Sequence, residues 1–325
     1  MRARAVRIES TGGPEVLQFA DVDLPEPGPG EVLIRSTAIG LNFIDTYHRS
    51  GLYPVELPAP LGTEAAGVVE SIGEGVTGLA PGDRVATFGP GRGAYATARI
   101  VPAAALVRLP DDIPDETAAA SMLKGCTTEF LVERCGRVEA GWPVLVHAAA
   151  GGVGLLLVQW LKAVGATVIG TTGTEEKAAL ARAAGADHVL LAGESGLAAR
   201  VRDLTGGEGV RVTFDGVGKA TFETSLDATA KRGLVISFGN ASGAVGAVDF
   251  AILARKGSLF ATRPTLFDYY VTRAERQAGA ARLFEMLRNG TIEVTVGQRY
   301  ALEDVRRAHE DLEARRTVGS TLLIP

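Results

Sequence analysis

The sequence predicts two domains: a barrel-like domain of short β-strands and a parallel α/β domain inserted toward its C-terminal side. The length of 325 residues exceeds the roughly 100–200 residues of a single domain. Short strands separated by Gly and Pro fill the first third of the chain, and strands alternate with helices from about Glu116. We expect the barrel-like domain to span residues 1–122 and 263–325, and the α/β domain to span residues 123–262.

The first part of the chain, up to about Pro110, shows short apolar segments between turn residues. Closely spaced short strands with turn signals are typical of an all-β barrel or sandwich. No long helical period occurs here, which favours the barrel. The clearest segments are Val32–Arg35, Ala65–Val69 and Arg84–Thr87, with a Pro-rich turn at Pro25–Gly30.

The second part alternates apolar strands with helices. Strands are predicted at Val144–His147, Thr167–Gly170, His188–Leu191, Val210–Asp215 and Gly233–Phe238. Helices are predicted at Gly152–Val164, Glu175–Ala184 and Leu197–Leu204. Repeated βα units with nearly continuous apolar strands imply a parallel sheet that is covered on both faces. Beyond about Arg263, helices at Tyr269–Arg288 and Glu303–Arg315 and a strand at Thr321–Ile324 are expected to return the chain to the first domain.

Composition and charge exclude several classes of function. Hydrophobic residues make up 46% and charged residues 22% of the chain, an ordinary globular balance. A net charge of −5 is a poor match for nucleic acid or an anionic membrane. Cys126 and Cys135 cannot supply a disulfide framework or a four-thiolate zinc site. With no apolar signal region and no apolar run of about 20 residues, we expect a cytoplasmic protein.

The strongest chemical signal lies where the first strand of the α/β part turns into its helix. In the fingerprint G-x-G-x-x-G, Ala149 replaces the first glycine, whereas Gly151 and Gly154 keep the second and third. The second glycine lets the backbone approach a pyrophosphate, and the third lets the helix pack on the strand. The helix N-terminus offers N–H groups to the phosphates. Because further βα steps follow, this segment predicts a dinucleotide site. Its residues are Ala150, Gly151, Gly152, Val153 and Gly154.

The end of the second α/β strand favours NADPH over NADH. NAD sites usually carry an acidic residue there to bind the ribose 2′-OH. This strand instead ends in Thr172 and Gly173, and Lys177 follows where a 2′-phosphate could lie. The competing interpretation is that Lys177 is a solvated helix residue, partly offset by Glu175 and Glu176.

Seven runs, spread over nearly the whole chain, resemble the zinc-independent quinone oxidoreductases of the zeta-crystallin type, within the medium-chain dehydrogenase/reductase superfamily. They are Gly12–Leu17, Gly40–Asp45, Ser50–Pro54, Leu61–Gly67, Ala80–Val85, His147–Gly154 and Ser237–Asn240. The resemblance implies a GroES-like barrel with an inserted Rossmann domain, and NADPH-dependent hydride transfer to a small-molecule quinone. It also implies a homodimer formed by edge pairing of the Rossmann sheets, with Gly233–Asn240 and Gly257–Thr262 including the plausible edge strands.

The resemblance also assigns site residues. Asn42 and Tyr47 are placed on the nicotinamide side of the cleft, with Thr127 nearby. Phe238, Gly239 and Asn240 are placed under the nicotinamide ribose, Lys177 at the adenosine phosphate, and Arg263 facing the cleft. Tyr53 is a candidate pocket wall or proton donor. The catalytic candidates are therefore Asn42, Tyr47, Tyr53 and Arg263.

Other interpretations of these residues stay open. Tyr47 and Tyr53 could simply pack beside Pro54, and Asp45 could cap the helix that starts near it. Ala192 stands where close bacterial relatives have a Tyr at the adenosine end, a departure that bears on NADP affinity.

The resemblance predicts catalysis without a metal. Zinc-dependent members carry a Cys ligand near Asn42 and a His at the position of Thr63, and Asn and Thr are poor zinc ligands. His48 is expected to be an isolated surface residue, and His147 to have a packing or backbone-bonding role. Two alternatives to quinone reduction remain: NADPH-dependent reduction of an enone or alkenal double bond, and non-catalytic NADPH binding as a crystallin or RNA-binding protein. The acidic net charge opposes RNA binding.

Overall fold

The computed structural model describes residues 1–89 and 91–325, which form two compact units. Unit 1 comprises Met1–Lys124, Tyr270–Phe284 and Val294–Pro325, and unit 2 comprises Gly125–Tyr269 and Glu285–Glu293. Unit 1 therefore holds both chain ends, and unit 2 is inserted into its sequence. The domain limits expected from the sequence, at residues 122/123 and 262/263, stay a prediction.

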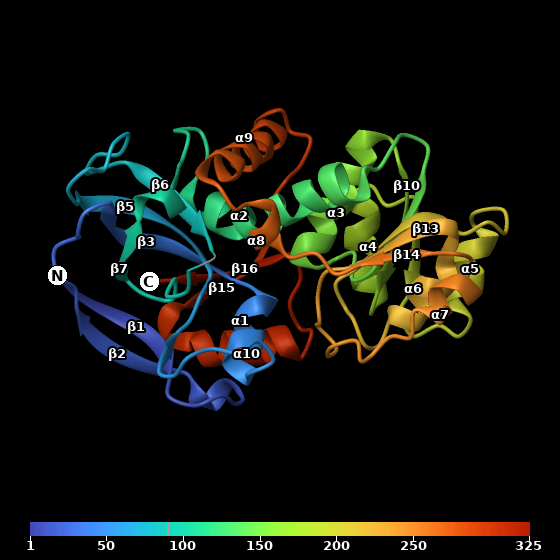
Figure 1. The fold of residues 1–325 in the computed structure, drawn as a ribbon, viewed down its shortest axis with the longest axis horizontal. Coiled ribbons are helices and arrows are strands. Elements are labelled where there is room, and N and C mark those ends of the chain that lie inside the picture. The colour runs from blue at the N-terminus through green and yellow to red at the C-terminus, as the bar shows by residue number, and fades with distance from the viewer. Residues whose placement is uncertain (90) are drawn as a thin grey trace. The chain divides into compact units, whose positions relative to one another are not determined.

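Unit 1 is built from a three-stranded and a seven-stranded sheet (Figure 1). The first has the order β2-β1-β4, and the second has the order β15-β16-β3-β5-β6-β8, with β7 also paired to β3. A bridge between Ala5 and Ala96 joins the two sheets, and one apolar core lies between them. The strands are β1 Arg2–Ile8, β2 Gln18–Asp23, β3 Glu31–Leu41, β4 Ala59–Pro60, β5 Glu64–Ile72, β6 Arg84–Phe88, β7 Ala98–Pro102, β8 Val107–Arg108, β15 Val296–Ala301 and β16 Ser320–Ile324.

Two helices of unit 1 matter for the site, α1 (Phe43–Ser50) and α10 (Val305–Glu313). α1 begins at Asn42, whose backbone N–H donates to the Asp45 carboxylate at 2.9 Å, and it ends at Gly51 in the left-handed conformation. The capping role expected as one option for Asp45 is thus confirmed. Helix α2 (Asp115–Glu129) is followed by a π-helical segment, Phe130–Gly136, and the boundary between the units falls within α2.

The helix predicted at Tyr269–Arg288 is divided in two. A short helix α8 (Leu266–Tyr269) precedes α9 (Arg273–Arg288). The cause is a reciprocal cap: the Glu275 N–H donates to Thr272 Oγ1 at 3.2 Å, and the Thr272 N–H donates to Glu275 Oε2 at 2.7 Å. This cap starts a new helix.

Unit 2 contains a six-stranded parallel sheet with the order β11-β10-β9-β12-β13-β14. Leu145 and Ile169 pack with Val201 of α5 on one face, while Val144 and Val146, which point to the other face, are fully buried too. Helices flank both faces (Figure 1), and the predicted fold class is confirmed. The strands are β9 Pro143–Val146, β10 Thr167–Thr172, β11 His188–Leu191, β12 Val210–Asp215, β13 Thr229–Ser237 and β14 Phe260–Thr262; the helices are α3 Gly152–Val164, α4 Glu175–Ala183, α5 Leu197–Asp203, α6 Phe222–Ala228 and α7 Ala251–Arg255.

One expectation about the sheet is wrong. Gly233–Asn240 was expected to include an edge strand, but β13 pairs with β12 on one side and with β14 on the other. The edge lies one strand further out, at β14, within the other expected segment.

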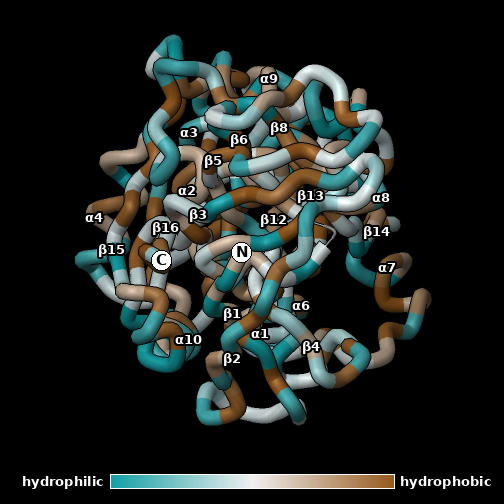
Figure 2. Tube along the Cα trace, turned by 90° about the vertical axis from the view of Figure 1, so that its left-hand side faces the viewer, coloured by the Kyte–Doolittle hydropathy of each residue, from teal (hydrophilic) through white to brown (hydrophobic). Residues whose placement is uncertain are grey.

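Hydrophilic and hydrophobic residues alternate along most elements, as expected where one face is buried and the other is solvated (Figure 2).

Within residues 1–89 and 91–325, no helix is both long and apolar enough to cross a membrane.

Candidate functional site

The predicted phosphate loop is a tight turn between β9 and α3. The Ala149 N–H donates to the Thr171 carbonyl of β10 at 2.9 Å, and the Gly151 N–H donates to the Ala148 carbonyl at 2.9 Å. Ala148 has a φ of 52°, in the left-handed region. Ala149, which the sequence placed at the turn in the position of the first glycine, lies within this turn, and the left-handed residue is the one before it. A residue with a Cβ atom costs about 1–2 kcal/mol in this conformation, so the surrounding hydrogen bonds hold the loop in place.

The two glycines of the loop differ in what requires them. A Cβ atom on Gly154 would lie 2.2 Å from the Ala148 carbonyl oxygen and 2.8 Å from the Ala149 carbonyl carbon. The packing of α3 on the loop therefore demands glycine at position 154. A Cβ atom on Gly151 would approach only the Ala148 oxygen, at 3.3 Å. The surrounding protein atoms therefore leave almost enough room for a Cβ atom at Gly151. This open space can accept a ligand group that approaches the backbone.

Donors line this space. Leu155 is the first residue of α3 whose N–H donates back along the chain, to the Gly151 carbonyl at 2.9 Å. For Ala150, Gly152 and Val153, the described residues include no backbone acceptor for the N–H. Unpaired N–H groups and the positive end of the helix dipole form an anion site. The loop therefore fits a dinucleotide diphosphate.

The end of β10 carries the predicted adenosine-side residues. Thr172 is buried, and its hydroxyl donates to the Thr174 carbonyl at 3.2 Å. Gly173 borders open space, and Lys177 lies half-buried in the first turn of α4. The neighbouring Glu175 pairs with Arg182 at 3.1 Å, which offsets one of the two acids that compete with a phosphate for Lys177. The exposed Ala192 also lies here, since its N–H donates to the Thr172 carbonyl at 2.7 Å.

The structure brings Phe238, Gly239, Asn240 and Arg263 together at the carboxyl end of β13. Arg263 Nη1 donates to the Ser237 carbonyl at 2.8 Å. With the Asn240 amide oriented to satisfy both of its atoms, Arg263 Nη2 donates to its oxygen at 3.1 Å. A Cβ atom on Gly239 would lie 2.3 Å from the Gly216 carbonyl oxygen, so the loops after β12 and β13 are in backbone contact. Because the sheet is parallel, these residues and the phosphate loop share its carboxyl edge, where such sheets bind ligands.

The predicted residues of unit 1 lie on α1 and the loop after it. The Asn42 side-chain nitrogen donates to Glu64 Oε2 at 2.8 Å. The rings of Tyr47 and Tyr53 meet edge to face with centroids 5.2 Å apart, and the Tyr53 N–H donates to the Tyr47 carbonyl at 3.0 Å. These aromatic contacts agree with the packing role considered for both tyrosines, and Tyr47 also contacts the Phe43 ring, with centroids 6.3 Å apart. Thr127, the remaining predicted residue, is buried in α2 of unit 2.

His48 and His147, the two histidines considered in the sequence analysis, lie in different surroundings. His48 is half-buried against Tyr53, with ring centroids 6.0 Å apart, so the expectation of an isolated surface residue is wrong. Burial and then the charge of Arg92 lower the pKa of His48 to about 4. His147 is buried, and its Nδ1 pairs with the Thr171 hydroxyl at 2.9 Å beneath the phosphate loop.

Sequence reasoning missed two buried acids. Asp215 ends β12 and accepts from the N–H groups of Val217 and Gly218, both at 2.9 Å, which shapes the loop that Gly239 contacts. Glu64 accepts from the Asn42 amide, from the Leu123 N–H at 2.6 Å and from Lys124 Nζ at 3.3 Å. An acid at the end of an apolar strand, as at Asp215, was the available signal for the first.

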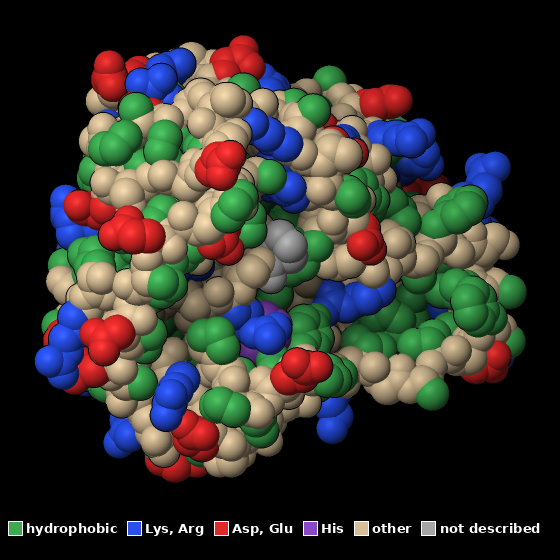
Figure 3. All heavy atoms as spheres, turned by 60° about the vertical axis from the view of Figure 1, so that its left-hand side comes forward, with side chains coloured by type: hydrophobic (Ala, Val, Ile, Leu, Met, Phe, Trp, Pro, Cys, Tyr) green, Lys and Arg blue, Asp and Glu red, His purple; other side chains and the backbone are tan. Residues whose placement is uncertain are grey.

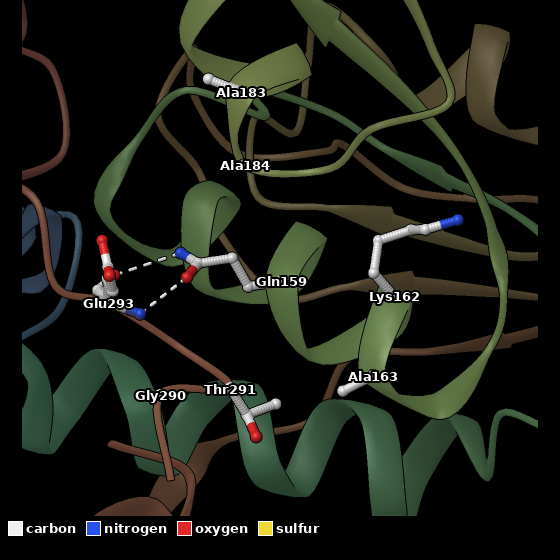
Figure 4. A pocket seen from close by; sticks show the side chains of 8 residues that line it. All are labelled: Gln159, Lys162, Ala163, Ala183, Ala184, Gly290, Thr291 and Glu293. Carbon is white, nitrogen blue, oxygen red and sulfur yellow. Dashed lines mark hydrogen bonds between the residues drawn. The ribbon is translucent and has the colours of Figure 1, made fainter. Parts of the chain in front are cut away.

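A separate cavity of about 410 Å³ lies on unit 2 beside α3 and α4 (Figure 4). The Gln159 side chain donates to the Glu293 carbonyl and accepts from its N–H, at 3.1 and 2.7 Å, so its polar atoms are already engaged. Lys162 points away from it toward Asp187, at 2.8 Å. No predicted site residue lines this cavity.

Within residues 1–89 and 91–325, no group of three or more His, Cys, Asp and Glu side chains could hold a metal ion. Asn42 and Thr63, at the positions where zinc-dependent relatives have ligands, donate instead to Glu64 at 2.8 Å and to Asp45 at 2.7 Å.

Comparison with known proteins matches both parts of the chain. Residues 28–111 match the alcohol dehydrogenase GroES-like domain, and residues 152–285 match the zinc-binding dehydrogenase family. The chain is 50% identical to the quinone oxidoreductase of Pseudomonas aeruginosa, covering 99% of this chain and 100% of the relative. It is 42% identical to the 2-haloacrylate reductase of Burkholderia sp, with 99% and 98% covered. Escherichia coli quinone oxidoreductase complexed with NADPH superimposes with a TM-score of 0.97, at 47% identity, covering 99% of this chain and 100% of that one.

Proposed function

Because the chain belongs to the quinone oxidoreductase family of the medium-chain dehydrogenase/reductase superfamily, we propose that it reduces quinones with NADPH. The phosphate loop carries this proposal: the open space at Gly151 and the N–H groups at the start of α3 fit the cofactor diphosphate. When bound, NADPH supplies a hydride from nicotinamide C4. The chain's own residues bind the cofactor and orient the quinone.

The predicted site residues divide between cofactor and substrate. We assign the diphosphate to Ala150–Gly154, the adenosine phosphate to Thr172, Gly173 and Lys177, and the nicotinamide ribose to Phe238, Gly239 and Asn240. Asn42, Tyr47 and Thr127 would contact the nicotinamide, and Tyr53 and Arg263 the quinone. The residues assigned to the adenosine phosphate and to the nicotinamide ribose all lie at the carboxyl edge of the parallel sheet of unit 2. This position supports their assignment.

We further propose that the reaction needs no metal. A quinone accepts a hydride without strong polarisation, because the product is a stabilised hydroquinone anion. The Asn42 and Thr63 side chains are engaged in hydrogen bonds to Glu64 and Asp45, which agrees with this proposal. Elemental analysis of the active enzyme tests it: a stoichiometric transition metal that activity requires would overturn it.

The second candidate function is reduction of an activated C=C bond, which the similarity to a 2-haloacrylate reductase favours. Steady-state NADPH oxidation should be measured with a panel of quinones beside a panel of enones and 2-haloacrylates. We expect kcat/KM to be at least about tenfold higher for the best quinone, a difference of about 1.4 kcal/mol in transition-state stabilisation. Turnover of the second panel alone would overturn quinone reduction.

If the protein reduces no compound of either panel but still binds NADPH, the non-catalytic alternative is favoured. On the face drawn in Figure 3, acidic and basic side chains are interspersed, which suits a small-molecule enzyme better than a nucleic-acid binder.

Lys177→Ala tests the preference for NADPH. We expect KM for NADPH to rise about tenfold or more, because a hydrogen bond to a charged group contributes about 1.5–3 kcal/mol. KM for NADH should barely change, since NADH lacks the 2′-phosphate. Lys231→Ala is the matched control, because Lys231 is exposed near the amino end of β13, away from the carboxyl edge. Equal changes for both cofactors would remove the case for a phosphate contact.

We also propose a cytoplasmic homodimer. The outer edge of β14 has no strand partner among the described residues, and Phe260 on it is 64% exposed, which supports edge pairing with a second copy. The free thiols of Cys126 and Cys135 suit a reducing compartment. The molar mass in solution, measured by light scattering, tests the dimer.

A further inference from the structure

A continuous series of hydrogen bonds runs through the interior of unit 1 from Glu313 to Asp45. We call its four buried members, Arg49, His309, Tyr95 and Asp45, the buried relay. The Arg49 guanidinium donates to both Glu313 oxygens, at 2.9 and 2.7 Å, and its Nη1 lies 3.0 Å from His309 Nδ1. His309 Nε2 lies 3.1 Å from the Tyr95 hydroxyl, which donates to Asp45 Oδ2 at 2.9 Å. Arg49 is 2% exposed, and His309, Tyr95 and Asp45 are fully buried.

The chemistry of the four groups fixes the direction of these bonds. A guanidinium can only donate, so His309 Nδ1 accepts from Arg49. Burial and then the charge of Arg49 lower the pKa of His309 to about 3, so the ring is neutral and carries its proton on Nε2. That proton is donated to the Tyr95 oxygen, which leaves the Tyr95 hydrogen for Asp45. The three bonds between Arg49 and Asp45 therefore all point from the Arg49 cation toward the Asp45 carboxylate.

The Asp45 carboxylate accepts hydrogen bonds from two further donors. It accepts from the Thr63 hydroxyl at 2.7 Å and from the Asn42 N–H at 2.9 Å, in addition to Tyr95. Burial raises the pKa of Asp45 to about 6, while these three hydrogen bonds and the charge of Lys124 act in the opposite direction. On protonation, Asp45 loses its charge and one of its oxygens becomes a donor, so the hydrogen bonds that the carboxylate accepts are weakened.

A second buried pair of charged groups acts on these residues. Glu64 and Lys124 lie 3.3 Å apart and are buried, and Glu64 also holds the Asn42 side-chain amide. Burial and then the charge of Asp45 raise the pKa of Tyr95, and the negative charge of Glu64 acts in the same direction with a smaller effect. Tyr95 therefore stays a neutral donor, and the only group of the relay placed to titrate near neutral pH is Asp45.

We propose that Arg49, His309 and Tyr95 are positioning residues, which hold the Asp45 carboxylate and, through it, Asn42 and the first turn of α1 in the orientation that the reaction needs. This inference rests on the proposed function, in which Asn42 and Tyr47 contact the nicotinamide. None of the three residues needs to touch substrate or cofactor, because the relay acts through the backbone N–H of Asn42.

The test is Tyr95→Phe, which removes one donor to Asp45 and keeps the ring. The pKa of Asp45 should rise, so the acid limb of the kcat/KM profile against pH should move upward by about one pH unit. Thr63→Val removes a different donor to the same carboxylate and should move the limb in the same direction. The matched control is Tyr300→Phe, which removes a 2.6 Å bond from Tyr300 to Asp311 elsewhere in unit 1 and should leave the limb unchanged.

A titration of the Asp45 carboxylate by NMR, without substrate, separates the possible failures. If Tyr95→Phe and Thr63→Val both leave the pKa of Asp45 and the acid limb unchanged, the relay is merely structural and the inference is overturned. If the pKa of Asp45 moves but the limb does not, Asp45 does not position the reacting groups, which also overturns it. A shifted pKa in an enzyme that turns over no quinone contradicts the proposed function instead. Should Tyr95→Phe fail to fold, Thr63→Val still decides the outcome.

Discussion

Gly154→Ala is expected to weaken NADPH binding at least about a hundredfold, which corresponds to about 2.7 kcal/mol. The added Cβ atom would lie 2.2 Å from the Ala148 carbonyl oxygen. That atom belongs to the backbone of a loop tied to Thr171 through the Ala149 N–H, so it cannot turn aside as a flexible side chain would. Either the loop or the start of α3 must shift, and the N–H groups would then no longer converge on the diphosphate. Titration with NADPH, followed by its fluorescence, gives the dissociation constant.

Two further alanine variants make this experiment specific. Gly246→Ala should bind NADPH like the unmodified protein, because its Cβ atom would have no neighbour within 4 Å and its φ is not positive. Gly151→Ala should keep the thermal stability and lose affinity, since the protein almost accommodates that Cβ atom while a diphosphate would not. Unchanged NADPH affinity in Gly154→Ala would show that the cofactor binds elsewhere.

Arg49→Met is expected to destabilise the protein by about 3 kcal/mol, the second large effect. Arg49 is 2% exposed and donates to the Gly12 carbonyl at 3.1 Å, to His309 and to Glu313. Methionine fills a similar volume but leaves the Gly12 oxygen and His309 Nδ1 buried without a donor. Urea denaturation, monitored by circular dichroism, gives the free energy of unfolding.

Arg299→Met is the matched control for this substitution. Arg299 also pairs with a carboxylate in unit 1, that of Glu116 at 2.7 Å, but the two side chains are 52% and 45% exposed. An exposed pair contributes no more than about 1 kcal/mol. Equal losses in the two variants would mean that the burial of Arg49 does not matter for stability.

Several elements of the α/β part could be predicted to the residue, although β13 begins at Thr229 rather than at Gly233, and helices α6 and α7 were not predicted. Helix α3 and strands β11 and β12 have the predicted bounds. Parallel strands buried on both faces are continuous apolar runs, and Gly165, in the left-handed conformation, marks the end of α3. The pairing of unit 1 could not be predicted in this way, because β16 pairs with β3 from the opposite end of the sequence. Half-buried strands that pair across such distances carry no local signal of their partner.

The candidate site divides in the same way. The phosphate loop follows a local motif, so the sequence predicted the turn between β9 and α3, but it did not predict that Ala148 takes the left-handed conformation. The buried relay joins residues that are far apart along the chain, such as Arg49 and His309, which are separated by 260 positions. No periodicity or motif connects such residues, so the sequence suggested only the helix cap for Asp45.

The alanine in the left-handed turn has a consequence for how the cofactor enters. A glycine at position 148 would adopt its φ of 52° freely, but it would also adopt many other conformations in the unliganded protein. Alanine at positions 149 and 150, where φ is not positive, restricts the backbone by about 0.4–1 kcal/mol per residue relative to glycine. The hydrogen bonds of the turn hold Ala148 in its left-handed conformation, so the loop has little disorder left to lose when the nucleotide arrives, and its shape is preorganised for binding.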